Sequence, residues 1–320
     1  MKDNYGRTIN YMRISITDRC NMRCRYCMPD GIEKVSMSKI LTYEDILRIA
    51  EAATGIGITR FKITGGEPLV RLGCADLIRD IKALPGTEQV TITTNGMELA
   101  KYMPDLKAAG IDAINVSLDT MDKDKFRYIT QCGDLEKVME GIESAIASGI
   151  RTKINCVPQK GFNENEIPDF AKFAFAKGID IRFIELMPIG QSDAGKGLSN
   201  DAILSKLSEI YPELEPDGSI HGNGPAVYYQ IPGKKGGIGL ISAMHGIFCS
   251  SCNRIRLTSQ GMIKPCLCYE ESIDIKPALE GNIQDIQELL KRAVEIKPGQ
   301  HCFNEMPDNI EKRSMSQIGG

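Results

Sequence analysis

Tryptophan is absent from the 320-residue sequence, and aromatic residues make up only 6% of it. So few aromatic side chains argue against an extended surface on which nucleic-acid bases could stack. An excess of positive charge is also lacking, since the net charge is −3, so no global basic field would attract nucleic acid. No apolar run approaches the roughly 20 residues that a membrane-spanning helix needs. We therefore expect no nucleic-acid partner and no membrane partner.

The N-terminal residues 1–7 have charges but no apolar segment behind them, so they do not resemble a secretory signal peptide. We expect a cytoplasmic protein. Histidine is scarce, with three residues, whereas cysteine is abundant, with eleven. In a reducing compartment, cysteines serve more often as metal ligands or free thiols than as disulfides. An odd number also cannot pair fully within one chain.

Short apolar stretches alternate with longer stretches of helical periodicity over the first two thirds of the chain. The short stretches are rich in Ile, Val, Phe and Thr, as buried strands are. The expected strands are Tyr11–Thr17, Thr59–Thr64, Gln89–Thr94, Asp112–Leu118, Thr152–Val157 and Asp180–Leu186. The expected helices are Tyr43–Gly55, Leu72–Leu84, Asp134–Ala147, Glu166–Ala176, Asn200–Tyr211 and Ile283–Val294.

Six such units predict an α/β fold, with a parallel sheet and helices on its outside. Because a closed barrel of this kind needs eight units, we expect a TIM-like, partial (βα)6 barrel that stays open. The pattern then changes, and Ala226–Ile231 and Gly237–Ser242 flank a Pro-Gly-Lys-Lys-Gly turn that predicts an antiparallel hairpin. We expect the barrel over residues 1–225 and a smaller α+β region over residues 226–320.

Cys20, Cys24 and Cys27 have the spacing C-x3-C-x2-C directly after the first predicted strand. Barrel enzymes place their active sites at this end of the strands. Thiolates favour soft metals and iron–sulfur clusters, and three ligands on a four-iron cube leave one iron for an outside ligand. A structural zinc site would need a fourth ligand nearby, and the histidines are distant in sequence. A zinc knob or free thiols remain the alternative.

The segment Gly65-Gly66-Glu67-Pro68 follows the second predicted strand. Adjacent glycines let a ligand approach the backbone closely, and a carboxylate beside them can hold an ammonium group. An ordinary turn is the alternative interpretation.

A second group, Cys249, Cys252 and Cys266, has the spacing C-x2-C-x13-C. It again supplies three thiolates and predicts a second cluster with an open iron. A zinc ribbon completed by Cys268 is the alternative, and spacing alone does not decide between them.

Arginines accompany both cysteine groups. Arg13 lies inside the first predicted strand, where a charge needs a partner. Arg254 and Arg256 would share one face of an extended segment beside the second group. Two guanidiniums near a cluster with an open iron suit a polyphosphate. A solvated strand face is the alternative.

Together these motifs resemble the GTP 3′,8-cyclases of molybdenum-cofactor biosynthesis, a family of the radical S-adenosylmethionine (SAM) superfamily. The resemblance spans almost the whole chain and begins with the run Tyr-Met-Arg-Ile-Ser-Ile-Thr-Asp-Arg-Cys-Asn-Met-Arg-Cys-Arg-Tyr-Cys-Met-Pro at 11–29. It continues with Lys-Ile-Thr-Gly-Gly-Glu-Pro-Leu, Thr-Thr-Asn-Gly, Asn-Val-Ser-Leu-Asp, Arg-Phe-Ile-Glu-Leu-Met and Phe-Cys-Ser-Ser-Cys-Asn-Arg-Ile-Arg-Leu, and it ends with the terminal Gly-Gly.

The resemblance implies two [4Fe–4S] clusters, SAM as cofactor and GTP as substrate. A 5′-deoxyadenosyl radical would abstract the 3′ hydrogen of GTP, and the ribose radical would attack C8 of guanine to give 3′,8-cyclo-7,8-dihydro-GTP. The first cluster would be held by Cys20, Cys24 and Cys27, and the second by Cys249, Cys252 and Cys266. SAM would be bound around Tyr26, Gly65, Gly66, Glu67, Ser117 and Met187. GTP would be bound by Arg13, Lys62, Thr93, Lys153, Arg254, Ile255 and Arg256. The terminal Gly319 and Gly320 would enter the active site as a flexible finger with a catalytic role.

The resemblance further implies an external electron donor, cyclic pyranopterin monophosphate synthase as the downstream enzyme, and a monomer or homodimer. A peptide-modifying radical enzyme with an auxiliary cluster is the competing enzyme class. The Arg254-x-Arg256 pair and the single additional cysteine triplet favour the nucleotide substrate instead. A zinc protein without enzymatic activity is the second competing hypothesis.

Overall fold

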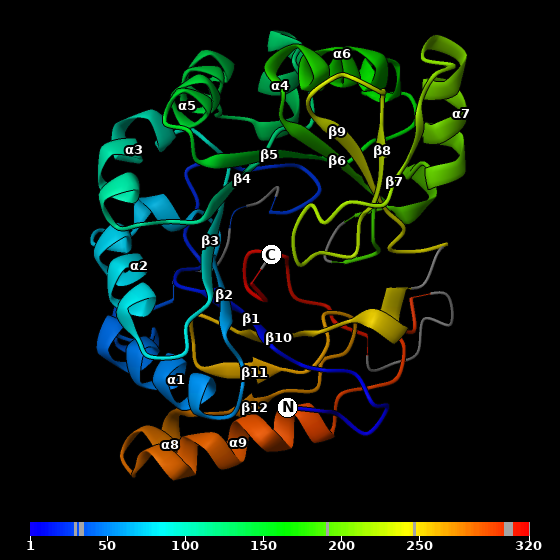
Figure 1. The fold of residues 1–320 in the computed structure, drawn as a ribbon. Coiled ribbons are helices and arrows are strands. Elements are labelled where there is room, and N and C mark those ends of the chain that lie inside the picture. The colour runs from blue at the N-terminus through cyan, green and yellow to red at the C-terminus, as the bar shows by residue number, and fades with distance from the viewer. Residues whose placement is uncertain (29–30, 32–34, 190–191, 246–247, 304–309, 320) are drawn as a thin grey trace.

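The computed structural model describes residues 1–28, 31, 35–189, 192–245, 248–303 and 310–319. Over these residues one sheet of 12 strands curls around a hollow, and its strand order is β12-β11-β10-β1-β2-β3-β4-β5-β6-β9-β8-β7. Helices cover the outer side of the curl, and the C-terminal residues run inside it (Figure 1). The predicted α/β partial barrel is confirmed.

The six predicted β-then-α units form the body of this sheet, and their strands pair in parallel in sequence order. The strands are β1 (Tyr11–Ser15), β2 (Arg60–Thr64), β3 (Gln89–Thr94), β4 (Ala113–Ser117), β5 (Arg151–Cys156) and β6 (Asp180–Ile184). The helices between and after them are α1 (Tyr43–Gly55), α2 (Cys74–Ala83), α3 (Leu99–Ala108), α4 (Lys123–Thr130), α5 (Leu135–Ala147) and α6 (Ile167–Lys177).

Local sequence signals explain where these helices begin and end. Thr42 caps α1 through a reciprocal pair of hydrogen bonds with Asp45, a capping box that satisfies two backbone N–H groups. Gly110, Gly149 and Gly178 all have positive φ at the ends of helices, a conformation in which glycine commonly ends a helix. Two of these six helices, α3 and α4, were not predicted from the sequence. Pro104 interrupts the helical pattern of α3, and α4 is a short helix of only eight residues.

The sheet extends beyond the six predicted strands at both ends. The predicted hairpin is present as β8 (Val227–Gln230) and β9 (Gly237–Ile241), and β9 pairs in parallel with β6. At the other end β10 (Arg254–Leu257) pairs in parallel with β1. The C-terminal region therefore extends the sheet at both ends and places both cysteine groups around one hollow.

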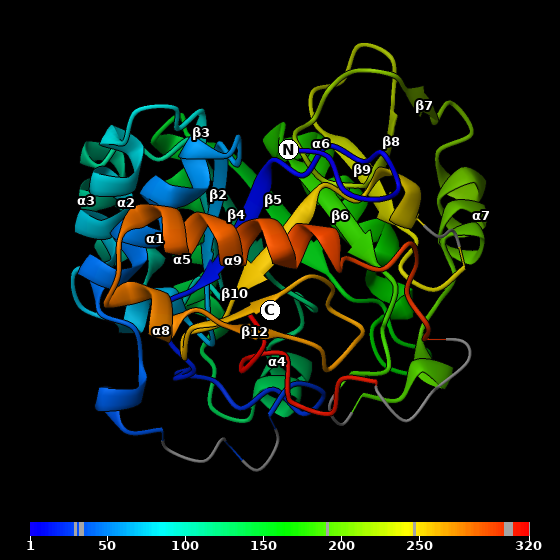
Figure 2. The ribbon, with the colours of Figure 1, turned by 90° about the horizontal axis from the view of Figure 1, so that it is seen from below.

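The remaining elements lie at the two ends of the sheet and on its outside. They are β7 (Glu215–Asp217), β11 (Met262–Lys264), β12 (Ile273–Asp274), α7 (Asn200–Ile210), α8 (Lys276–Leu279) and α9 (Ile283–Glu295). Helix α9 packs along α1 (Figure 2), and the guanidinium of Arg48 on α1 donates to the carbonyl oxygens of Leu279 and Gly281 ahead of α9. In the part of the chain that the structure describes, no helix combines the length and apolarity needed to cross a membrane. The boundary at 225/226 stays a prediction.

Candidate active site

A cavity of about 610 Å³ lies inside the curl of the sheet, and both cysteine groups line it. Its floor and walls come from the inward side chains of the parallel strands and from the loops at their carboxyl ends. The thiols in its lining are Cys20, Cys24, Cys27, Cys249, Cys252, Cys266 and Cys268. The chain thus brings together two thiol groups that are more than 200 residues apart in sequence.

The first thiol group lies in the loop after β1. The Sγ of Cys20 accepts hydrogen bonds from the Met22 N–H (3.4 Å) and the Asn95 amide (3.7 Å). Burial raises the pKa of Cys20 to about 11 and that of Cys27 to about 11. It also raises the pKa of Cys24 well above its usual value, and the charges of Asp119 and the neighbouring thiols add to that shift. These thiols are therefore protonated at neutral pH until a positively charged metal centre replaces the protons.

The second thiol group combines two residues before β10 with one after β11. Burial raises the pKa of Cys249, whose Sγ accepts a hydrogen bond from the His301 N–H. Burial would also raise the pKa of Cys252, but the positive charges of Arg254 and Lys297 outweigh it and lower this pKa to about 7. Cys252 is thus partly a thiolate at neutral pH, which favours metal binding.

The two thiol groups suit iron–sulfur clusters better than a single metal ion. Within the described residues, no three His, Cys, Asp or Glu side chains are placed to hold a single metal ion. The six motif thiols instead form two groups of three that face one cavity, and thiolates are the usual ligands of iron–sulfur clusters. The donor set is therefore of the kind that holds iron–sulfur clusters.

The glycine turn after β2 packs directly on the loop that leads to Cys20. The Gly66 N–H donates to the Thr17 carbonyl oxygen at 2.8 Å, and the Glu67 N–H donates to the Arg19 carbonyl oxygen at 2.8 Å. A Cβ atom at Gly66 would lie 2.4 Å from the Arg19 carbonyl oxygen. Only glycine allows this close backbone contact, so the turn fixes the entry to the first thiol group.

Glu67 is fully buried and does not belong to the cavity lining. Its carboxylate accepts hydrogen bonds from the Leu69 N–H (3.0 Å), the Thr94 hydroxyl (2.7 Å) and the Asn95 N–H (2.6 Å). Burial raises the pKa of Glu67 to about 7, although these three donors oppose the shift. The side chain therefore braces the carboxyl end of β2 against that of β3.

The other residues expected around SAM belong to the cavity lining and come from different strand ends: Tyr26, Gly65, Gly66, Ser117 and Met187. The Tyr26 hydroxyl donates to the carboxylate of Asp119 at 2.6 Å, and the Val157 N–H donates to the same carboxylate at 2.9 Å. Burial raises the pKa of both Tyr26 and Asp119. Asp119 thus links the first cysteine loop to the end of β5.

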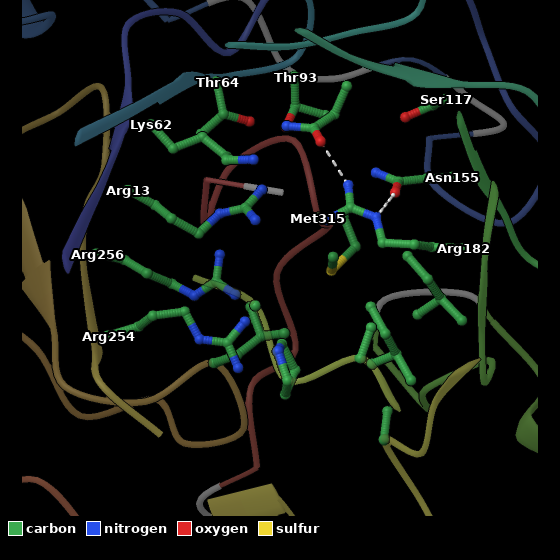
Figure 3. Close-up of a pocket in the computed structure, with 18 of the residues that line it drawn as sticks. Arg13, Lys62, Thr64, Thr93, Ser117, Asn155, Arg182, Arg254, Arg256 and Met315 are labelled. Atoms are coloured by element: carbon green, nitrogen blue, oxygen red, sulfur yellow. Dashed lines mark hydrogen bonds between the residues drawn. The ribbon is translucent and has the colours of Figure 1, made fainter. Parts of the chain in front are cut away.

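A row of positive side chains forms one wall of the cavity. Arg256, Arg13 and Lys62 are register partners on the adjacent strands β10, β1 and β2. Figure 3 shows them gathered with Arg254 on one side of the cavity. Burial, together with the neighbouring positive charges, lowers the pKa of Arg13 to about 10 and also lowers the pKa values of Lys62 and Arg256. Such mutual repulsion is relieved when an anion binds between the charges.

Ile255 has a different environment from its two arginine neighbours. Its side chain is fully buried in the main hydrophobic core, and it is not part of the cavity lining. Because side chains alternate along a strand, Arg254 and Arg256 face the cavity while Ile255 faces the helices.

The C-terminal tail reaches this basic wall. The Gly319 carbonyl oxygen accepts hydrogen bonds from Arg256 Nη1 at 2.8 Å and from Arg13 Nε at 3.4 Å. Gly319 has φ of 81°, a conformation that glycine adopts easily. Gly320 lies outside the described residues.

Lys153 and Thr93 line the same cavity from β5 and β3. Lys153 Nζ lies 2.7 Å from a carboxylate oxygen of Asp180 and 2.8 Å from the Tyr228 hydroxyl. Burial lowers the pKa of Lys153 to about 8, although Asp180 opposes the shift. Thr93 lies on β3 beside Asn115 of β4. All seven expected GTP contacts except Ile255 therefore line one cavity.

Arg182 is a cavity residue that the sequence reasoning missed. It donates from Nε to the Asn155 side-chain oxygen (2.9 Å) and from Nη2 to that of Asn115 (2.5 Å), as Figure 3 shows. It lies inside the predicted strand Asp180–Leu186. The signal that singled out Arg13, a charge within a buried strand, was therefore present here as well.

Comparisons with known proteins match both parts of the chain. A family model described as the radical SAM superfamily matches residues 14–174, and one described as Molybdenum Cofactor Synthesis C matches residues 179–303. A GTP 3′,8-cyclase of Alkaliphilus oremlandii is 46% identical over all of both chains. GTP 3′,8-cyclases of Moorella thermoacetica and Clostridium perfringens are 44% and 42% identical, again over all of both chains.

Solved structures show the same fold at low identity. Streptococcus suis SuiB bound to S-adenosylmethionine matches with a TM-score of 0.60 and 16% identity, over 88% of this chain and 64% of that chain, just under two thirds of its length. Native anSMEcpe with bound AdoMet matches with a TM-score of 0.57 and 15% identity, over 89% of this chain and 84% of that chain. At this identity the likeness concerns the fold alone.

Proposed function

This chain belongs to the GTP 3′,8-cyclase family of the radical SAM superfamily, and we propose that its cavity holds SAM and GTP between two [4Fe–4S] clusters. The chain is an enzyme of molybdenum-cofactor biosynthesis, and its reaction joins C3′ of GTP to C8 of the guanine by radical chemistry. The observation that carries the assignment of roles is the basic wall of the cavity that both thiol groups line.

The first thiol group, Cys20, Cys24 and Cys27, would hold the cluster that works with SAM. Bound together, that cluster and SAM supply a 5′-deoxyadenosyl radical after one-electron reduction. Gly65 and Gly66, which line the cavity, would contact SAM through their backbone. Ser117, Tyr26 and Met187 would contact SAM from other strand ends.

Glu67 takes a supporting part in this proposal. Its carboxylate is outside the cavity lining and receives three hydrogen bonds from within the protein. It would therefore act on SAM by holding the glycine turn in place rather than by contacting the ammonium group of SAM.

The basic wall would hold the triphosphate of GTP. Arg13, Arg254 and Arg256 offer guanidiniums, which match the geometry of phosphate oxygens, and Lys62 adds a further charge. Ile255 would contribute only its backbone, because its side chain faces away from the cavity. Thr93 and Lys153 would contact GTP from β3 and β5.

The second thiol group lies next to this wall. Cys249, Cys252 and Cys266 would hold the second cluster, and the lowered pKa of Cys252 favours its thiolate. Arg254, which lowers that pKa, would then contact both the thiolate and the nucleotide.

The tail shares hydrogen-bond donors with the nucleotide site. Arg13 and Arg256 donate to the Gly319 carbonyl oxygen, so the bound triphosphate and the tail meet at the same two guanidiniums. We propose that Gly319 and Gly320 order the reacting end of the site through this contact.

Several further expectations accompany this proposal. An external electron donor would reduce the first cluster, and cyclic pyranopterin monophosphate synthase would consume the product. The assembly as monomer or homodimer, the cytoplasmic location and the division at 225/226 also stay predictions.

Anaerobic turnover tests the proposal. Protein reconstituted with iron and sulfide is incubated with GTP, SAM and a reductant, and nucleotides are separated by chromatography with mass detection. We expect 5′-deoxyadenosine together with a cyclised GTP that has the mass of GTP. A matched Cys20→Ala protein should give neither product, whereas Cys74→Ala, at the start of α2 in the main core, should give both. Intact GTP with wild-type protein would contradict the assignment.

A further inference from the structure

Two thiols outside both motif groups lie in contact with each other. The Sγ atoms of Cys268 and Cys302 are 3.0 Å apart, and the Cys302 N–H donates to Cys268 Sγ at 3.3 Å. Both side chains are buried, with exposed fractions of 0% and 4%. The residues are 34 positions apart in sequence, so the fold has to bring them together. The function proposed above assigns neither of them a role.

The pair joins two segments that matter for the site. Cys268 follows Cys266 by two residues, in the loop after β11. Its carbonyl oxygen accepts a hydrogen bond from the Glu311 N–H at 2.7 Å, and the adjacent Tyr269 forms a β-bridge with Ile310. Cys302 lies earlier in the chain than the C-terminal tail, and the contacts of Ile310 and Glu311 hold that tail against the Cys268 loop. The contact therefore lies where the loop of a proposed cluster ligand meets the C-terminal tail.

The surroundings of the pair are apolar. Cys268 and Cys302 belong to a small buried cluster with Phe303, Ile189 and Ile318 that is separate from the main core. Ile318 directly precedes Gly319, whose carbonyl oxygen meets the basic wall. A bond between the two sulfurs would therefore stiffen the packing on which the end of the tail rests.

We propose that Cys268 and Cys302 are a redox site, a dithiol that closes to an intramolecular disulfide. A disulfide needs its sulfurs at roughly 2.05 Å, so the 3.0 Å contact closes by a movement of about 1 Å. The oxidant is a low-molecular-weight disulfide. The Cys268–Cys302 S–S bond forms, both thiol protons leave, and the two electrons cleave the oxidant's S–S bond to give two free thiols.

The dithiol is the state expected in a reducing compartment, and a small disulfide shifts it to the closed state when the thiol pool becomes oxidised. Because both sulfurs are buried, closure requires the cluster of Phe303 and Ile318 to open briefly. The closed state then links the Cys266 loop covalently to the segment before the tail.

The test uses the anaerobic holoenzyme with its clusters. It is equilibrated with glutathione disulfide, quenched in acid, treated with iodoacetamide, digested and analysed by mass spectrometry. We expect the peptides of Cys268 and Cys302 to appear linked, lighter than their sum by two hydrogen atoms, and to escape alkylation. Dithiothreitol before the quench should restore both alkylation sites. Alkylation of both thiols at every concentration of glutathione disulfide, or linkage of Cys268 to Cys266, would overturn the proposal.

Matched variants separate this site from the metal ligands. Cys302→Ser should abolish the linked peptide and keep the iron and sulfide content of the wild type. Cys74→Ser changes an equally buried thiol in the main core and should leave the linkage intact. Loss of one cluster's iron from Cys302→Ser or Cys268→Ser would identify the pair as cluster ligands and overturn the proposal.

The disulfide should also be visible in the behaviour of the tail. Limited proteolysis should remove the tail several-fold more slowly from the oxidised holoenzyme than from the reduced one, and Cys302→Ser should remove this difference. Equal cleavage rates in the linked and reduced wild-type protein would contradict the link between the pair and the tail.

Discussion

Arg13, Lys62 and Arg256 lie side by side on three adjacent strands, and burial, together with nearby positive charges such as that of Arg254, lowers the pKa of each. Sequence reasoning could identify the arginines, because a charge inside a buried strand needs a partner. It could not foresee the size of the repulsion, since this depends on which strands become neighbours. The pairing of β10 with β1 joins residues more than 240 positions apart and sets this arrangement.

Replacing Arg13 tests the role of the basic wall. Arg13→Ala should raise the Kd for GTP about tenfold to a hundredfold, because one charged hydrogen bond contributes roughly 1.5–3 kcal/mol. The Kd for guanosine should change much less, since guanosine has no phosphate. Calorimetry on the reconstituted protein measures both. Arg79→Ala, at an exposed site paired with Asp76 and Asp80, is the control and should bind GTP normally. An equal loss for guanosine and GTP would refute the assignment.

The lowered pKa of Lys153 predicts a pH dependence of GTP binding. Burial places this pKa at about 8, so the ammonium is charged below pH 8 and loses its charge as the pH rises through 8. Its attraction for GTP is therefore present at pH 7.5 and declines towards pH 9, with an expected rise in Kd of about tenfold. In Lys153→Arg the guanidinium stays charged over this range. A Kd for that variant as pH-dependent as that of the wild type would show that another group titrates.

At the scale of secondary-structure elements, the turn after β2 holds the site together through backbone contacts. Its glycines were recognisable from the sequence as a place of close approach, and the strands and most helices followed from periodicity. The sequence did not show that Glu67 turns away from the cavity, because the Thr94 and Asn95 donors come from the next strand end. Helix α3 was missed because Pro104 is unfavourable inside a helix and hides its pattern.

A single methyl group should disturb this turn. In Gly66→Ala the new Cβ would lie 2.4 Å from the Arg19 carbonyl oxygen, so the loop before Cys20 must shift. We expect a loss of about 1–3 kcal/mol in the free energy of unfolding, the usual range for overpacking, together with weaker SAM binding. Thermal unfolding and equilibrium dialysis measure these changes. Gly218→Ala has open space around its Cβ and should behave as wild type. A Gly66→Ala protein with normal SAM affinity would argue against the turn as a binding element.

At the scale of the whole molecule, the C-terminal region extends the open sheet at both ends and its last residues run inside the curl (Figure 1). The buried ion pair of Lys264 with Glu311 anchors this tail, and Arg313 adds a second contact to the same carboxylate at 2.8 Å. Family resemblance suggested a tail that enters the site, but composition gave no sign of the anchor. Its partners are 47 residues apart, and only the folded chain brings them together.

Removal of residues 318–320 tests the tail. The truncated protein loses the buried Ile318 and the Gly319 carbonyl oxygen, which accepts from Arg256. It should keep both thiol groups and therefore its iron content, yet form cyclised GTP at a rate reduced at least about tenfold, the effect of losing one positioning contact of roughly 1.4 kcal/mol. Iron analysis and product chromatography on one preparation check both points. Normal turnover would exclude a role for the tail.

The most direct test of the account follows one hydrogen atom. GTP deuterated at C3′ is incubated anaerobically with the reconstituted protein, SAM and reductant, and 5′-deoxyadenosine is analysed by mass spectrometry. If the cavity places the ribose of GTP against SAM between the two thiol groups, the recovered 5′-deoxyadenosine carries the deuterium. Recovery of unlabelled 5′-deoxyadenosine, with the deuterium still on GTP, would contradict the central claim.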